Sequence, residues 1–118
     1  MPKLIASPTR IASVGSVPKW ADEYVGIANT GEGAVSITRV VSPAGWQGEW
    51  QYSDYREYRV VLDGLLRVEQ TDGDIEVQAG QALDVEPGVW VRYATPGGAD
   101  YITVCIPAFS RATVHRKR

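Results

Sequence analysis

The chain alternates between short apolar segments and clusters of turn-forming residues along most of its length. The turn-forming clusters combine glycine with asparagine, aspartate, alanine or proline, at 29–31, 42–45, 63–64, 72–73, 79–80, 86–88 and 96–98. Between them lie segments rich in β-branched and aromatic residues, at 34–41, 55–62, 65–70, 74–78, 89–95 and 101–106. These segments have the length and composition of β-strands, and no part of the chain carries a long apolar face with helical period. The pattern predicts an all-β barrel or sandwich.

The two ends differ from this pattern. Residues 1–20 contain three prolines and predict an extended arm rather than a helix. Such an arm can pair with a neighbouring subunit or form a loose terminus, and the sequence leaves both readings open. Residues 111–118 predict a basic tail that lies on the surface, at least from Arg116 onward. The predicted barrel therefore covers residues 21–110.

Composition and charge narrow the possible partners and location. A chain of 118 residues suits one domain with its own core. Apolar residues make up 44% and the net charge is −2, so there is no broad basic field for nucleic acid. The single cysteine, Cys105, excludes an intramolecular disulfide, and no apolar run has the length of a signal peptide or a membrane span. We expect a cytoplasmic protein that binds neither nucleic acid nor membrane.

The segment 45–64 repeats the spacing of a known motif. Gly45, Gln51, Ser53, Glu57 and Gly64 stand at intervals that resemble the first motif of the cupin superfamily. In that motif, histidines occupy the positions of Gln51 and Ser53, and a glutamate occupies the position of Glu57. The resemblance implies that the glycines set the turns and that Glu57 points into a barrel.

A second segment extends the resemblance. Gly80, Glu86, Pro87 and Gly88 resemble the start of the second cupin motif, although Glu86 stands where cupins usually have proline. Val91 takes the position of the third histidine ligand. With the flanking strands, the likeness covers most of the chain and implies a single-domain cupin, a conical β-barrel of the double-stranded β-helix or jelly-roll type.

The ligand set departs from that of metal-binding cupins. Those proteins usually hold Mn, Fe, Ni or Zn with three histidines and one carboxylate, because imidazole nitrogen suits these ions. This chain keeps only Glu57, since an amide, a hydroxyl and a hydrocarbon replace the three imidazoles. We therefore expect no metal cofactor. The alternative is a weak Zn or Fe site built from Gln51, Glu57 and His115 if the C-terminal segment folds across the barrel mouth; otherwise His115 is a solvated surface residue.

Strand alternation extends the predicted interior. If Gln51, Ser53 and Glu57 point inward as in cupins, the two-residue period also directs other side chains inward, namely Arg59, Val61, Val91 and Tyr93. Glu57 and Arg59 then lie side by side inside the barrel. They could form an ion pair that plugs the pocket, or Arg59 could bind an anionic ligand oxygen while Glu57 moves a proton.

Arg39 is a further candidate whose direction the sequence leaves open. Either positions 35, 37, 39 and 41 or positions 36, 38 and 40 face inward on its strand. The second set begins with more polar residues, which favours the first set and places Arg39 in the cavity. A surface arginine is the alternative.

Aromatic residues and the cysteine complete the candidate set. The polar tip of Trp46 suits the rim of a ligand pocket, and it suits a subunit interface equally well. Alternation directs Tyr52 and Tyr58 away from the cavity. Cys105 is expected to line the interior together with Tyr101 and Thr103, as a buried structural thiol.

Two hypotheses of function follow. The first is a metal-independent cupin enzyme that transfers a proton on a small carbonyl, acid or polyketide-like intermediate, as a cyclase, isomerase or lyase. Glu57 and Arg59 would be catalytic, and the substrate would contact Arg39, Gln51, Ser53, Trp46, Tyr93, Cys105 and His115. The second is a non-catalytic cupin that binds a small molecule. Cupins commonly form dimers, and the arm and outward aromatic residues are compatible with a homodimer.

Overall fold

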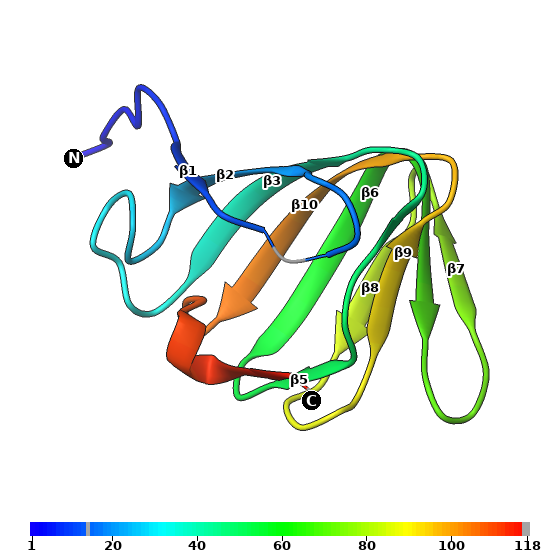
Figure 1. The fold of residues 1–118 in the computed structure, drawn as a ribbon. Coiled ribbons are helices and arrows are strands. Elements are labelled where there is room, and N and C mark those ends of the chain that lie inside the picture. Colours follow the sequence, from blue (N-terminus) through cyan, green and yellow to red (C-terminus); the bar gives the residue numbers. More distant parts are fainter. Residues whose placement is uncertain (14, 117–118) are drawn as a thin grey trace.

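The computed structural model describes residues 1–13 and 15–116, and its regular elements are strands apart from one short 3₁₀ turn (Figure 1). The elements in order are β1 (Thr9–Ile11), β2 (Trp20–Val25), β3 (Ser36–Ser42), β4 (Trp46–Gln47), β5 (Gln51–Ser53), β6 (Arg56–Glu69), β7 (Ile75–Gln78), β8 (Ala82–Val85), β9 (Arg92–Thr95), β10 (Ala99–Ile106), the 3₁₀ turn η1 (Arg111–Thr113) and β11 (Val114–Arg116). The all-β prediction is confirmed. No helix in this part of the chain has the length and apolar character needed to cross a membrane.

Most strands belong to one curled antiparallel sheet. Its main path runs β1–β2–β3–β10–β6–β9–β4, and β7 and β8 also pair with β6. The first half of β6 pairs with β10 and β8, whereas its second half pairs with β7 and β9. The strand therefore connects the two walls of the barrel, and the β5–β11 ribbon lies at one end (Figure 1).

Gly64 allows β6 to pass between the two walls. The sequence suggests a turn at 63–64, but the strand continues without a break from Arg56 to Glu69. Gly64 has a φ of +78°, and a Cβ atom there would lie 2.3 Å from the Gly98 carbonyl oxygen. A left-handed residue inside a strand bends the sheet and admits a close backbone neighbour. The glycine therefore curls the barrel and does not reverse the chain.

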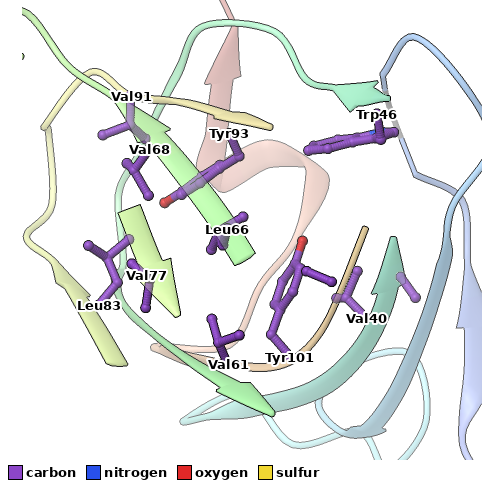
Figure 2. Close-up of a cluster of buried hydrophobic side chains, with 12 residues drawn as sticks. Val40, Trp46, Val61, Leu66, Val68, Val77, Leu83, Val91, Tyr93 and Tyr101 are labelled. Atoms are coloured by element: carbon purple, nitrogen blue, oxygen red, sulfur yellow. The ribbon is translucent and has the colours of Figure 1, made fainter. Parts of the chain in front are cut away.

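Inward side chains divide the interior into an apolar end and a polar end. Valines and leucines of β6, β7 and β8 pack at one end together with Val91, which directly precedes β9. Tyr93 and Tyr101 lie between this apolar cluster and Trp46 (Figure 2). On β6 the inward residues Glu57, Arg59 and Val61 are all buried, as the alternation predicts. The polar end of the interior is therefore built by the first half of β6.

Segments near both ends of the described chain pair with the barrel strands. β1 pairs with β2 of the same chain, and the arm then runs past β4, where the Ser16 amide donates to the Gln47 carbonyl at 2.8 Å. β11 pairs with β5. Strands outside the predicted 21–110 boundaries thus complete the structure, while Lys117 and Arg118 of the predicted tail lie outside the described residues.

Candidate functional site

A cavity of about 120 Å³ opens at the polar end of the barrel. Its floor comes from the inward faces of β3, β6, β9 and β10, and its rim from the N-terminal arm, the β4–β5 connection and β11. The walls carry three basic side chains, Lys19, Arg59 and Arg116, and two carboxylates, Glu49 and Glu57. A small polar molecule bound there would contact both basic and acidic side chains.

Glu57 and Arg59 form the centre of the floor. They are 3% and 8% exposed, and Arg59 Nε donates to Glu57 Oε1 at 2.9 Å. Tyr93 donates its hydroxyl hydrogen to the same carboxylate oxygen, and Arg59 Nη1 donates to the Tyr101 hydroxyl at 3.2 Å. Within residues 1–13 and 15–116, no hydrogen bond reaches Glu57 Oε2. The ion pair predicted as one alternative is present, and it lines an open cavity.

Burial and charge determine the protonation states of Tyr93 and Arg59. Burial and the negative charge of Glu57 raise the pKa of Tyr93 well above its usual value, so its hydroxyl remains a donor. Burial alone would lower the pKa of Arg59, but the charge of Glu57 and the adjacent tyrosines raise it. The Arg59 guanidinium also lies 3.6 Å from the centroid of the Tyr93 ring. Arg59 is therefore a permanent cation in the cavity.

Gln51 and Val91 occupy the places that the cupin resemblance assigns to two histidine ligands. They exchange backbone hydrogen bonds of 2.9 and 2.8 Å, and Gln51 lines the cavity. Ser53 does not belong to the cavity wall, because the strand is interrupted at 54–55 and Tyr55 provides this part of the lining. The prediction that Ser53 faces the cavity is wrong for that reason.

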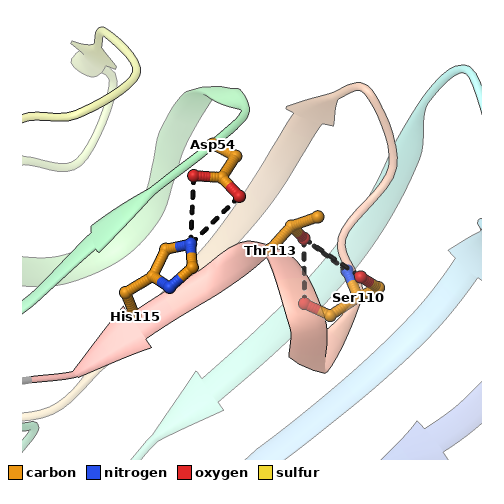
Figure 3. A network of polar contacts seen from close by, with 4 residues as sticks. All are labelled: Asp54, Ser110, Thr113 and His115. Atoms are coloured by element: carbon orange, nitrogen blue, oxygen red, sulfur yellow. Dashed lines mark hydrogen bonds and ion pairs between the residues drawn. The ribbon is translucent and has the colours of Figure 1, made fainter.

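His115 lies on the outside of the β5–β11 ribbon. The C-terminal segment does fold back onto β5, with His115 opposite Tyr52 and Arg116 opposite Gln51. The His115 ring stacks on Tyr52 at 4.6 Å, and its Nε2 lies 3.0 Å from both carboxylate oxygens of Asp54 (Figure 3). Because neighbouring strand residues point to opposite sides, Arg116 lines the cavity and His115 does not.

The proposed alternative metal site is therefore wrong in its geometry. His115 faces away from Glu57 and cannot complete a site with Gln51 and Glu57. Among the described residues, no three histidine, cysteine, aspartate or glutamate side chains are grouped to hold a metal ion. The donors at the cupin ligand positions do not fit a transition metal either, since only Glu57 offers a strong ligand.

Arg39 lies on the outer surface, so the favoured prediction that it lines the cavity is wrong. It forms a bidentate pair with Asp100, with distances of 3.0 Å from Nε and 2.6 Å from Nη2. The inward set of β3 is instead Ser36, Thr38 and Val40. Small hydroxyl residues fit inside because the barrel satisfies them: Ser36 Oγ accepts a hydrogen bond from the Phe109 amide at 3.0 Å.

Trp46 and Cys105 both line the cavity, as the sequence suggests. The Trp46 ring is buried and forms part of the wall facing Lys19. Burial and the charge of Glu57 raise the pKa of Cys105 to about 12, so the group is a neutral thiol. Tyr101 and Thr103 share the interior with Cys105, whereas Tyr52 packs outward against Trp90.

Sequence reasoning misses several lining residues, notably Lys19 and Arg116. Lys19 directly precedes β2 and falls within the predicted arm, where no periodicity indicates its direction. Arg116 falls within the predicted surface tail, and only the pairing of β11 with β5 brings it to the cavity.

Comparison by sequence gives only a partial match. No protein-family model matches the chain. The endoribonuclease YbeY of Myxococcus xanthus is 32% identical over 99 residues, covering 82% of this chain. The matched chain spans only 34% of that protein.

Several solved structures resemble the fold of this chain. A cupin-like protein of Thermotoga maritima matches with a TM-score of 0.77 at 13% identity, over 98% of this chain and 89% of that one. Oxalate decarboxylase of Bacillus subtilis matches with 0.75 at 17% identity, over 95% of this chain and 30% of that one. The EutQ protein of Clostridium difficile matches with 0.67 at 16% identity, over 77% and 64%. The predicted cupin-type jelly-roll fold is confirmed.

Proposed function

We propose that this cupin-type chain is a metal-independent enzyme that transfers a proton on a small carbonyl or acid compound, with Glu57 as the acid–base group. The observation that carries the proposal is the asymmetric environment of the Glu57 carboxylate. Arg59 and Tyr93 hold Oε1, whereas Oε2 has no hydrogen bond among the described residues. One oxygen is thus positioned by the protein, and the other can reach a proton of a bound ligand, which acid–base catalysis requires.

Cavity size and charge support a small anionic or carbonyl substrate. The volume of about 120 Å³ is close to that of a cavity that holds benzene, roughly 150 Å³, and below the roughly 300 Å³ at which pockets for drug-sized ligands begin. Arg59 and Arg116 provide positive charge for a carboxylate or an enolate oxygen. Proton transfer next to a carbonyl is the step shared by cyclases, isomerases and lyases of this kind.

The direct test follows exchange of carbon-bound hydrogen. Pyruvate and a panel of small oxo acids, aldehydes and sugars are incubated with the protein in deuterated water, and exchange is measured by NMR. We expect Glu57→Gln to lower the exchange rate by about 10²- to 10⁴-fold. Glu69→Gln is the matched control, because Glu69 forms an ion pair with Arg92 away from the cavity and its loss should leave exchange unchanged.

A binding module without catalysis is the second candidate. It is favoured by the fact that Glu57 and Arg59 already satisfy one another. Calorimetry with the same panel separates the two functions. A compound that binds while its carbon-bound hydrogens do not exchange and its mass does not change would support the binding module and contradict the enzyme.

A further inference from the structure

Lys19 presents an amine to the cavity in surroundings that differ from those of a surface lysine. Its Nζ lies 3.4 Å from the centroid of the buried Trp46 ring, and its side chain is partly buried. Within the described residues it forms no ion pair, although Arg59 and Arg116 line the same cavity. The face of the Trp46 ring attracts an ammonium group, whereas burial and neighbouring cations favour the neutral amine. Burial and the two arginines therefore make this amine release its proton more readily than one in water.

The protonation state of Lys19 agrees with this geometry. Burial, followed by the positive charge of Arg59, lowers the pKa of Lys19 to about 6. Glu57 opposes this effect and Arg116 adds to it. At neutral pH, most molecules therefore carry an unprotonated amine, which has the free electron pair that a nucleophile needs.

We infer that Lys19 is a nucleophilic amine that forms a Schiff base with a small aldehyde, ketone or 2-oxo acid in the cavity. This inference rests on the proposed function in placing a carbonyl compound there. The Nζ electron pair attacks the carbonyl carbon, and the carbonyl π pair moves to oxygen, which takes up a proton. The carbinolamine then loses water as the C=N bond forms. Neutral amine, carbonyl compound and one proton thus give a protonated imine and water.

The surrounding side chains suit this step. The Trp46 ring covers one side of the amine and limits the access of water to the imine. Arg59 donates through Nε and Nη1 to protein groups, and its Nη2 has no hydrogen bond among the described residues, so it can bind a ligand carboxylate. The carboxylate of Glu57 lines the same cavity and can remove a proton from the carbon next to the imine.

The test traps the imine with cyanoborohydride. Wild-type protein is incubated with pyruvate, and in parallel with propanal, and intact mass and peptide mapping locate the reduced adduct. We expect one adduct at Lys19, formed at least ten times faster than at Lys3. Lys19→Arg keeps a long basic side chain but cannot form an imine, and it should lose this adduct. Lys3→Arg is the matched control and should retain it.

A second measurement keeps the result independent of the variant's folding. The labelling rate of Lys19 in wild-type protein is followed against pH, and it should stay high near pH 7, where exposed lysines react slowly. Equal labelling of Lys3 and Lys19, or no Lys19 adduct with either probe, would overturn the inference. Pyruvate binding and Glu57-dependent exchange without an adduct would overturn the role of Lys19 alone. An adduct without Glu57-dependent exchange would overturn the proposed function, while the inference that Lys19 is a nucleophile would still hold.

Discussion

Burial of Glu57 beside Arg59 removes two charges from water, and only their mutual attraction and hydrogen bonds offset the desolvation. Tyr93 adds a hydrogen bond to Glu57, and the Tyr101 hydroxyl accepts one from Arg59. Removing one partner leaves the other uncompensated, which typically costs about 3–5 kcal/mol. Glu57→Gln must therefore be compared with wild-type protein under conditions where circular dichroism shows both to be folded.

Lys19 makes a pH-dependent contribution to stability. Its folded pKa of about 6 lies below its ordinary value, so between these two values the unfolded chain binds one more proton than the folded chain. The free energy of unfolding therefore gains at most about 1.4 kcal/mol per pH unit from this group as pH rises through that window. Below the folded pKa the penalty is complete and constant.

Lys19→Met removes this penalty, because methionine keeps the apolar stem and carries no charge. We expect the variant to be more stable than wild-type protein near pH 6, with the difference shrinking as pH rises toward 9. Urea unfolding at a series of pH values measures it. Lys3→Met is the control and should show no such trend, and a pH-independent difference for Lys19→Met would contradict the shifted pKa.

At the scale of the element, β6 depends on a single backbone conformation. Gly64 combines a φ of +78° with a carbonyl oxygen 2.3 Å from where a Cβ would be. We expect Gly64→Ala to lower the free energy of unfolding by about 2–4 kcal/mol, from left-handed strain and overpacking together. Thermal or urea unfolding measures the loss.

Gly80→Ala separates the two contributions to that loss. Gly80 also has a positive φ, of +86°, but a Cβ atom added there would have no heavy atom within 4 Å beyond its chain neighbours. Only the conformational strain of about 1–2 kcal/mol should appear there. Equal losses at the two glycines would show that the Gly98 contact does not constrain β6.

At the scale of the whole molecule, the outer face of the sheet carries exposed apolar side chains that bear on its assembly. Exposed apolar side chains gather on neighbouring strands of this face, at Trp20, Val41, Val60, Leu62 and Ile106. Val60 on β6 stands opposite Ile102 on β10 in the register. Exposed apolar side chains on one face of a sheet are found at subunit interfaces. We propose that two copies of the chain pack through this face.

Light scattering coupled to size exclusion tests the assembly. We expect a homodimer for wild-type protein and a monomer for Val60→Glu, because a buried unpaired carboxylate is strongly unfavourable at an interface. Ile75→Glu is the matched control: Ile75 is similarly exposed but lies on β7, away from this face, and its variant should stay dimeric. A monomeric wild type would contradict the proposal.

Local periodicity accounts for the features of the barrel that could be predicted from the chain. Alternation along β6 places Glu57, Arg59 and Val61 inside, and glycine spacing identifies the cupin-type barrel, because both depend only on residues near one another in the chain. Contacts made on folding decide three other features. They are the inward face of β3, the outward direction of His115 and the position of Lys19 in the cavity. Ser36 is satisfied by Phe109, His115 by Asp54, and Lys19 packs on Trp46. Each of these partners is distant in sequence, so only the folded barrel determines which side chain meets which.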